Sequence, residues 1–435
     1  MFLKKSFILV LLLLQGISLF AQSDFKLIDD TKKTPVADSI PVPDEVTYAL
    51  DHMLSNWFVS KTRKSNCDTT RFDHHVPDSV ISTRLRLMPC VMEMPFNNYV
   101  RSFVDLYTVR RRNQVSYLLG LGDYYFRLFE QVLDKNKLPI ELRYLPVIES
   151  ALNPTAISRA GAAGLWQFMT ATARMYGLEI NSLVDERMDP YKSTHAAARY
   201  LKDLYDIYGD WHLVIAAYNC GPGNVNKAIR RAGGKQDYWA IYPFLPAETR
   251  GYVPIFIAAN YSLYYANAHN ICKATIDFPK AVDTVMINQR VHFDQIASVL
   301  NMPKEQIKMM NPQYRREIIP GDLKPYAVVL PMKMTGMFID KMNEIVAYKA
   351  DSLVNNRRVE VSIPKAAASS SGSKVIYHTV RKGQTLSGIA ARYGVSVTRI
   401  KQWNNLRGSM IRPGQRLKIR SEEHTSELQS RGLIS

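Results

Sequence analysis

The sequence predicts a mainly α-helical protein, in which one large helical domain is followed by small modules of mixed strand and helix. Three observations point to this class. Apolar residues recur at helical spacing through 97–133. Apolar runs at 145–152 and 211–219 each end in a helix stop that contains Pro. After Cys272 the pattern changes to strand-like alternation at 284–287, and a repeated pattern follows.

The N-terminal end of the chain reads as an export signal followed by an irregular leader. Two lysines precede an apolar run at 7–14, and residues 1–21 form the predicted signal peptide. An uncleaved membrane anchor is the alternative, but the run is shorter than the ~20 residues that a spanning helix needs. Residues 22–90 are expected to be an irregular leader with some helix at 46–58.

The composition favours an exported protein that meets an acidic polymer. The formal net charge is +17. The basic residues are scattered, and together with the export signal this argues against nucleic acid as a partner. We expect an acidic extracellular polymer as the partner instead. No Cys lies near residue 21, so a lipid anchor is not expected.

The cysteines predict no metal site. Their spacing contains no Cys-x-x-Cys pair and no accompanying pair of His, as zinc sites require. A disulfide between Cys67 and Cys90 is one expectation for an oxidising compartment, and isolated buried thiols are the other. The sequence therefore predicts neither a metal nor a cofactor. The four positions are Cys67, Cys90, Cys220 and Cys272.

One stretch, 145–178, carries the candidate catalytic acid. An apolar run ends in Glu149-Ser150, and a small-residue turn at 158–164 leads to a helix that is expected to open at Leu165. A carboxyl that closes a buried helix and faces such a turn is held in apolar surroundings. Its charged form is disfavoured there, so it can act as an acid near neutral pH. A solvated surface residue is the alternative interpretation of Glu149 taken alone.

Further helices complete the helical domain, which is expected to span 91–275. Before the first of them, three acidic residues are interpreted as caps or salt-bridge partners, and Ser193-Thr194 as a cap. The acidic residues are Asp185, Glu186 and Asp189. The expected helices are 196–208, 211–219 and 255–266.

These segments resemble the lytic transglycosylase domain related to goose-type lysozyme. The family's A-Y-N-x-G block stands here at 217–221, and its E-T-R-x-Y-V block stands at 248–253. Blocks in the family's order extend over 145–254. The E-S and S-x-x-G-A-x-G-L-x-Q signature is matched by Glu149-Ser150, Ser158, Gly161-Ala162, Gly164-Leu165 and Gln167.

The resemblance implies a lysozyme-like, all-helical catalytic domain that acts on peptidoglycan. It implies that Glu149 is the catalytic residue and that Glu248 orients groups near the site. Core packing is the alternative role for Met169 and Tyr252. The implied substrate-binding residues are Ser158, Gln167 and Met169 along the glycan groove, Tyr218, Asn219 and Tyr252 close to the scissile sugar, and Glu248.

A site with one carboxylate restricts the chemistry. Glycosidic cleavage usually takes two carboxylates. Glu248 is a second acid in the blocks, but the resemblance implies an orienting role for it, so Glu149 is the one catalytic carboxylate expected. In the lytic transglycosylases, as the resemblance implies, the Glu protonates the leaving oxygen. It then removes a proton from the C6 hydroxyl of the same N-acetylmuramic acid, which attacks its own anomeric carbon and leaves a 1,6-anhydro sugar. A hydrolytic muramidase on the same fold and a non-catalytic wall-binding scaffold are the alternatives.

An internal repeat occupies the C-terminal part of the chain, with its copies 93 positions apart. It pairs Ile296 with Ile389, Asn311 with Asn404 and Pro320 with Pro413. The later copy, 376–419, resembles a LysM module, a β-α-α-β unit that binds N-acetylglucosamine chains. The earlier copy, 276–335, lacks the opening Gly and Thr and is expected to be a degenerate module. The implied glycan-binding residues are Gly383, Thr385, Leu386, Asn404 and Pro413.

The remaining segments are expected to lack folded structure of their own. Residues 336–375 are predicted to be a linker, flexible at 366–373 (AAASSSGS). Residues 420–435 are expected to be a non-native tail, because they have no apolar period and read like a translated sequencing adapter. We expect export to the periplasm, free or peripheral to the outer membrane or cell wall. Similar transglycosylases of the membrane-bound D type carry a lipidated Cys, which is missing here.

Overall fold

The computed structural model describes residues 76–279, 281–355 and 374–421, apart from positions 382, 383, 385, 394, 396, 407 and 409. All of the described residues belong to one compact unit. The predicted signal peptide, the helix expected at 46–58 and residues 422–435 of the predicted tail lie outside them. The prediction of a tail from residue 420 is wrong for its first two residues, because 420 and 421 end a strand. Within the described part, no helix combines the length and the apolar content that crossing a bilayer requires.

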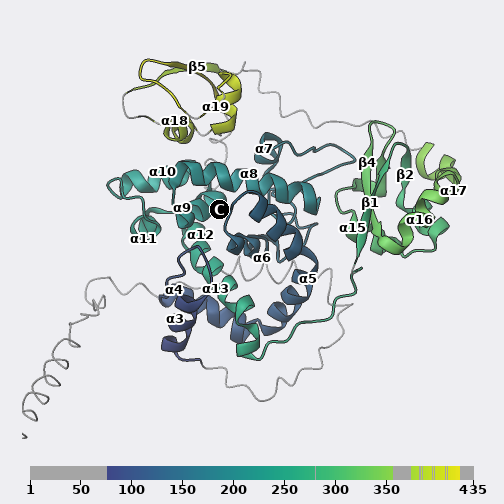
Figure 1. Ribbon diagram of the computed structural model, residues 1–435, viewed down its shortest axis with the longest axis horizontal. Coiled ribbons are helices and arrows are strands. Elements are labelled where there is room, and N and C mark those ends of the chain that lie inside the picture. The colour runs from purple at the N-terminus through teal and green to yellow at the C-terminus, as the bar shows by residue number, and fades with distance from the viewer. Residues whose placement is uncertain are drawn as a thin grey trace, which may run out of the picture. The chain divides into compact units, whose positions relative to one another are not determined.

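The first folded region is a set of α-helices around one hydrophobic core (Figure 1). The main helices are α3 (Asp78–Leu87), α4 (Asn98–Asp105), α5 (Arg112–Lys135), α6 (Leu145–Ser150), α7 (Thr170–Met175), α8 (Pro190–Tyr208), α9 (Trp211–Cys220), α10 (Pro222–Arg231), α11 (Tyr238–Ile241), α12 (Ala247–Arg250) and α13 (Tyr252–Tyr264). A π-helix, η1 (Leu106–Arg110), and the 3₁₀ helices η2 (Ile140–Tyr144), η3 (Tyr242–Phe244) and η4 (Ala266–His269) connect them. The predicted mainly α-helical class is confirmed.

Helix α13 is the central element of this domain. Every residue from Tyr252 to Leu263 is buried, and the helix packs against α4, α6 and α9. A helix that is apolar all round must be covered on all sides. Because α13 contacts α6 directly, its first residue, Tyr252, lies next to the helix that carries Glu149.

Several expectations about these helices are wrong. Instead of an irregular leader to residue 90 the structure has helix α3, and Ile81 and Leu85 enter the core at the helical spacing of four. Helix α8 begins at Pro190 rather than 196. Its cap is not Ser193-Thr194. It is Asp189, whose carboxylate accepts from the Lys192 N–H at 2.9 Å, so the interpretation of Asp189 as a cap is confirmed.

The helix expected from Leu165 does not form there and begins only at Thr170. Residues 163–168 make a tight turn instead, in which Ala163 pairs with Phe168. Gly164 and Gln167 have φ of +85° and +45°, and left-handed backbone at two positions interrupts a right-handed helix. The apolar run is buried in this turn conformation, with Leu165 and Trp166 fully covered.

The second region, 281–355, contains strands and helices around a separate core. Its strands β1 (Val282–Ile287) and β4 (Tyr326–Pro331) are antiparallel, as are β2 (Arg290–His292) and β3 (Ile318–Pro320). Its helices are α14 (Phe293–Leu300), α15 (Lys304–Met310), α16 (Met332–Asp340) and α17 (Met342–Ala347), followed by the π-helix η6 (Asp351–Asn355). A short 3₁₀ turn, η5 (Arg315–Glu317), precedes β3.

The predicted linker at 336–375 is therefore wrong in its first part. Helices α16 and α17 occupy 332–347, and Phe338 and Ile345 are fully buried in the core of this region. Two apolar anchors on successive helices make these residues part of the fold. Residues 356–373, which include the predicted flexible segment, lie outside the described residues.

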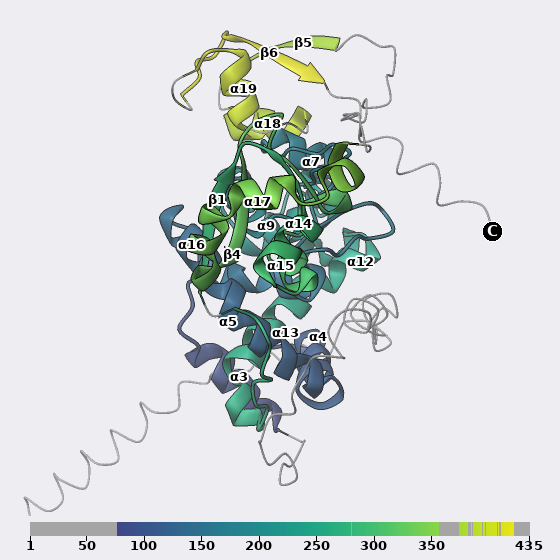
Figure 2. The same ribbon diagram turned by 90° about the vertical axis from the view of Figure 1, so that its right-hand side faces the viewer.

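The third region repeats the strand-helix-helix-strand order of the second. Strands β5 (Lys374–Thr379) and β6 (Arg416–Ser421) are antiparallel, and α18 (Leu386–Tyr393) and α19 (Val397–Trp403) lie between them in the sequence (Figure 2). Helices α18 and α19 stand 93 positions after α14 and α15. Asn311 and Asn404 each bond the last turn of a helix and the backbone of the returning strand, β4 or β6. The two copies thus share their fold and their strand register.

The cysteines are only partly paired. Cys90 and Cys220 carry free thiols, whereas Cys272 is disulfide-bonded. The suggested bond between Cys67 and Cys90 is therefore wrong, and Cys90 is an isolated thiol. Burial, and to a lesser extent the charge of Glu141, raises the pKa of the Cys90 thiol, which makes it a poor nucleophile.

Candidate active site

Glu149 lies in the last turn of α6, where the chain reverses sharply. The helix is six residues long, with Pro146 in its first turn, where a missing N–H costs nothing. It ends because Ala151 and Leu152 both have left-handed φ, at +50° and +60°. Their N–H groups donate back to the carbonyls of Val147 and Pro146. This C-cap ends the helix immediately after Glu149-Ser150.

The carboxyl of Glu149 is partly buried and has one identified hydrogen-bond donor. The hydroxyl of Tyr252, the first residue of α13, donates to Glu149 Oε1. Burial raises the pKa of Glu149 to about 7, although the Tyr252 hydrogen bond acts in the opposite direction. Among the described residues, burial and Tyr252 are the two influences on this pKa, and neither is a second carboxylate. Near neutral pH the group can therefore both give and accept a proton.

A small-residue turn, 156–168, lies beside α6 and is joined to it by Ser150. The Ser150 hydroxyl is fully buried and lies 2.9 Å from the carbonyl oxygen of Leu165 and 3.0 Å from that of Pro146. Ser158 closes the turn, since its Oγ accepts from the Ala162 N–H at 3.0 Å. The Gln167 amide donates to the carbonyls of Ala156 and Gly164 at 3.2 and 2.8 Å. Ser158 and Gln167 thus have structural contacts within the turn, and both remain partly exposed.

Tyr218 and Asn219 approach the site from the end of α9. Tyr218 donates its hydroxyl to the Trp166 carbonyl at 2.7 Å, and it is close enough to Glu149 for that charge to contribute, after burial, to its raised pKa. Asn219 is exposed, and its Oδ1 accepts from the Thr249 hydroxyl at 2.9 Å. Helices α6, α9 and α13 and the turn therefore bring Glu149, Tyr218 and Tyr252 together.

Two predicted residues stand at the surface without a described contact to Glu149. Met169 is 37% exposed at the start of α7, which agrees with an accessible position better than with core packing. Glu248 is exposed on the short helix α12. Tyr252, by contrast, is buried and reaches the carboxyl itself, so its main contact is to the candidate acid.

Two residues that support the site are not among those predicted from the sequence. Thr249 holds Asn219, and Arg187 donates to the carbonyls of Gly161 and Phe168 at 2.7 and 3.1 Å. Thr249 lies in the E-T-R-x-Y-V block, and Arg187 lies among the acidic residues interpreted as caps. A single sequence does not indicate which partner such a side chain contacts. Gly164 shows how close the packing is, because a Cβ there would lie 1.8 Å from the Arg187 carbonyl oxygen.

The residues expected to bind glycan in the third region fall into three groups. Gly383 and Thr385 lie outside the described residues. Leu386 is 1% exposed and lies in the core. The side-chain amide of Asn404 forms hydrogen bonds with the backbone of α19 and β6, so both residues have structural roles. Pro413 is exposed before β6. Of the described three, Pro413 alone is exposed.

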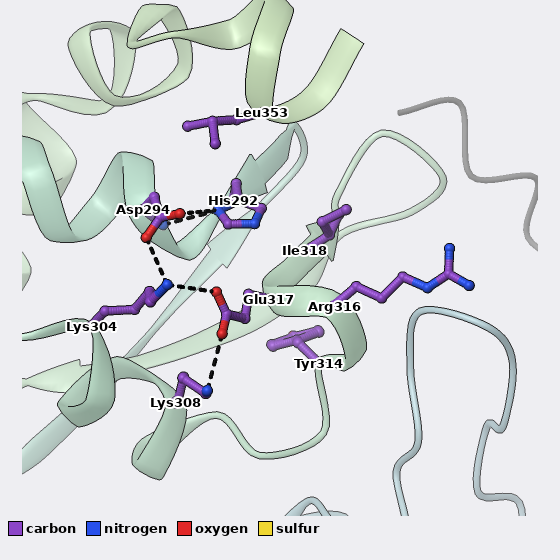
Figure 3. Close-up of a pocket in the computed structure, with 9 residues that line it drawn as sticks. All are labelled: His292, Asp294, Lys304, Lys308, Tyr314, Arg316, Glu317, Ile318 and Leu353. Atoms are coloured by element: carbon purple, nitrogen blue, oxygen red, sulfur yellow. Dashed lines mark hydrogen bonds and ion pairs between the residues drawn. The ribbon is translucent and has the colours of Figure 1, made fainter. Parts of the chain in front are cut away.

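One group of side chains has a composition that could suit a metal ion. Within the described residues this group is His292, Asp294 and Glu317, beside a cavity of about 830 Å³ in the second region (Figure 3). The Lys304 ammonium lies between the two carboxylates, 3.1 Å from each, and Lys308 lies 3.0 Å from Glu317. These ammonium groups already supply the positive charge that a cation would bring, so the cluster is a network of ion pairs.

Comparison with known protein families matches three parts of the chain. Residues 128–241 match the family model described as the transglycosylase SLT domain. Residues 281–347 match the LysM-like domain of the lytic transglycosylase MltD, and residues 378–420 match the LysM domain. The two LysM-type matches fall on the two copies of the internal repeat.

Individual relatives have the same character. Membrane-bound lytic murein transglycosylase D of Escherichia coli (strain K12) is 34% identical over 332 residues, which cover 75% of this chain and 70% of that protein. The soluble lytic murein transglycosylase of the same strain is 36% identical over 123 residues, 27% of this chain and 19% of that protein. The crystal structure of the 70 kDa soluble lytic transglycosylase of Escherichia coli aligns at 28% identity with a TM-score of 0.29, covering 34% of this chain and 26% of that one.

Proposed function

Because the chain belongs to the family of membrane-bound lytic murein transglycosylase D, we propose that Glu149 is the residue with which it cleaves glycan strands. The protein is a peptidoglycan-cleaving lytic transglycosylase. One observation carries the assignment to Glu149. Its carboxyl is partly accessible, has a pKa of about 7, and is influenced by a tyrosine hydroxyl rather than by a second acid.

The proposed reaction uses the same carboxyl twice. Glu149, protonated, gives its proton to the glycosidic oxygen between N-acetylmuramic acid and N-acetylglucosamine as the bond to the anomeric carbon breaks. The resulting carboxylate, which accepts the Tyr252 hydrogen bond, then takes the C6 hydroxyl proton of the same muramic acid. The C6 oxygen attacks the anomeric carbon, and the product is a 1,6-anhydro sugar. The attack is intramolecular, which can supply on the order of 7–11 kcal/mol in well-oriented systems.

The residues around Glu149 suit this role in different ways. We assign the glycan groove to the turn and its neighbours, with Ser158, Gln167 and the exposed Met169 along it. Asn219 and Glu248, both exposed, are assigned to the sugar beside the scissile bond. Tyr218 and Tyr252 are assigned roles within the site, because their hydroxyls bond protein groups there. The Tyr218 hydroxyl contacts the Trp166 carbonyl, and the Tyr252 hydroxyl contacts Glu149.

The third region is proposed to hold the enzyme on its polymer. Its match to the LysM domain supports glycan binding, and the assigned contacts are the exposed Pro413 together with Gly383 and Thr385. Peptidoglycan as the substrate, the net charge of +17 and the predicted signal peptide together favour export to the periplasm, peripheral to the outer membrane or cell wall.

Substitution of the acid tests the proposal. Glu149→Gln keeps the shape of the side chain and removes the transferable proton, so release of anhydro-muropeptides should fall by at least ~10²–10⁴-fold. Binding to purified sacculi should persist. Glu93→Gln, an exposed acid outside the site, is the matched control and should keep wild-type turnover.

Mass spectrometry of the products separates the remaining alternatives. Anhydro ends indicate transglycosylation, whereas a hydrolytic muramidase leaves reducing muramic acid that is heavier by one water. Near wild-type release of anhydro products by Glu149→Gln would refute the assignment of the acid.

A further inference from the structure

The second region is joined to the catalytic domain by more than surface contact. Leu183 and Val184, from the segment between α7 and α8, are fully buried in the core of the second region. The backbones also pair. The Arg315 N–H donates to the Leu183 carbonyl at 2.7 Å, and the Asp185 N–H donates to the Gln313 carbonyl at 2.9 Å. Between these two hydrogen bonds, Val184 and Tyr314 form an isolated antiparallel β-bridge.

A buried carboxylate sits at the centre of this joint. Asp185 is fully buried, and its two oxygens accept from Arg187 at 2.9 and 2.8 Å. The Arg315 guanidinium, from the second region, donates to Asp185 Oδ2 as well. Burial raises the pKa of Asp185, but the hydrogen bonds and charges of Arg187 and Arg315 outweigh it, so the pKa lies below the ordinary value. The carboxylate is thus ionised and shared by two arginines.

Arg187 carries this connection into the turn beside Glu149. Its side chain is 6% exposed, and its guanidinium donates to the carbonyls of Gly161 and Phe168, at the two ends of the segment that contains Gln167. Because Asp185 bonds the same guanidinium through two atoms, it fixes the direction in which the remaining donors point. The second region is therefore connected to the 156–168 turn by a chain of hydrogen bonds through Arg315, Asp185 and Arg187, and this chain does not include Glu149.

We propose that the second region is a built-in support of the glycan groove, and that Arg315 is a positioning residue acting through Asp185 and Arg187 on the 156–168 turn. This inference rests on the proposed function of that turn. It gives the degenerate LysM copy a role other than glycan binding. Two features support that role. Its ion-paired cavity offers no unpaired acid or lysine among Asp294, Lys304 and Glu317, and its core is completed by residues of the catalytic domain.

The test compares neighbouring arginines in the full-length protein. Arg315→Ala removes the guanidinium but keeps the backbone bond to Leu183. Arg316→Ala is the matched control, because Arg316 is exposed and extends away from the ion-paired cluster (Figure 3). The substrate is soluble, uncross-linked peptidoglycan, and the rate is measured as release of anhydro-muropeptides.

For Arg315→Ala we expect KM to rise about tenfold while kcat per folded enzyme stays within about twofold, because groove contacts rather than the acid are displaced. Amide hydrogen exchange of peptides covering 156–168 should quicken several-fold in the same variant. Arg315→Lys, which keeps a positive charge, should give an intermediate KM. Arg316→Ala should match the wild type in both measurements.

Simple loss of stability is distinguished by the same data, since it lowers the amount of active enzyme without changing KM. If Arg315→Ala does not fold, Arg315→Gln, with a side chain of intermediate length, is judged by the same criteria. A wild-type KM and unchanged exchange at 156–168 would overturn the inference, as would an equal effect of Arg316→Ala. Those results would not contradict the assignment of Glu149 as the acid. An active Glu149→Gln, in contrast, would contradict the proposed function but not the contacts between the second region and the catalytic domain.

Discussion

The proposed double role of Glu149, as acid and then as base, depends on its contact with Tyr252. An acid with an ordinary pKa of 4.5 is almost wholly ionised at neutral pH and has no proton to give. Partial burial raises the pKa to about 7, and the Tyr252 hydroxyl limits that rise by stabilising the carboxylate. The balance leaves both protonation states accessible, as a residue that gives and then takes a proton requires. Tyr252 therefore belongs to the proposed proton chemistry through its hydrogen bond to Glu149.

Replacing Tyr252 by Phe tests this balance. The hydrogen bond lowers the pKa of Glu149, so its loss should raise that pKa further. Activity that needs protonated Glu149 is lost as pH rises through its pKa, and the alkaline limb of kcat should move up by about one pH unit, for a hydrogen bond worth ~1.4 kcal/mol. The measurement is the pH profile of anhydro-muropeptide release.

Tyr125→Phe is the control for that profile. Tyr125 is a buried tyrosine whose hydroxyl has no hydrogen-bond partner among the described residues, so its removal should leave both limbs in place. An alkaline limb that stays unchanged, or moves to lower pH, in Tyr252→Phe would show that this hydroxyl does not tune Glu149.

Among the elements, the helix ends determine where the site residues lie. Helix α6 stops at Ser150 because two non-glycine residues adopt left-handed φ, and the 163–168 turn relies on the same conformation at Gln167. Such backbone costs roughly 1 kcal/mol or more at each non-glycine residue and is found where the surroundings hold it in place. Ser150 and Arg187 provide those surroundings here, through the Leu165, Gly161 and Phe168 carbonyls.

Helix α5 offers a test of this helix-end physics away from the site. Lys137 is exposed just beyond its end, with φ of +58°. Lys137→Gly should raise the free energy of unfolding by about 1 kcal/mol, because glycine adopts this conformation without steric cost. Lys135→Gly, at the last residue of the helix, should lower it by up to about 1 kcal/mol.

Urea unfolding of both α5 variants measures these opposite signs under identical conditions. Activity should not change in either, since neither lysine has been placed near Glu149. Equal destabilisation by the two substitutions would show that the left-handed φ at Lys137 is not the deciding feature.

At the scale of the whole molecule, the three cores differ in how independent they are. The core of the second region contains Leu183 and Val184 from the catalytic domain, so these two parts share buried surface. The core of the third region is built within 380–419 alone. The two copies of the repeat therefore differ in how they are packed. The second region shares its core with the catalytic domain, whereas the third region has a core of its own.

A chain ending at residue 355 tests this division. It lacks the third region, so its affinity for sacculi should fall by at least about tenfold, because one of two linked binding sites is lost. Cleavage of short soluble glycan strands and the main thermal transition should remain. Co-sedimentation with sacculi, product release and calorimetry give the three readouts. Unchanged sacculus affinity would argue against glycan binding by the third region.

The sequence by itself determined the family, the helical class and the candidate acid, because these depend on residue types at fixed spacing. Glu149-Ser150, the 158–167 signature and the 93-residue repeat are local patterns of this kind. It failed where long-range contacts override a local pattern. Leu165 to Met169 read as the start of a helix, yet they form a turn, and α16 and α17 stand within the predicted linker.

Only the tertiary structure decided which groups meet. Tyr252 lies 103 positions from Glu149 and Arg315 lies 130 positions from Asp185, and no spacing rule links residues so far apart. A side chain's hydrogen-bond partner and its pKa follow from the packing of whole elements, here α6 against α13 and the second region against the 179–187 segment. The candidate acid could therefore be predicted along the chain, while its raised pKa and the contacts that hold its surroundings required the folded molecule.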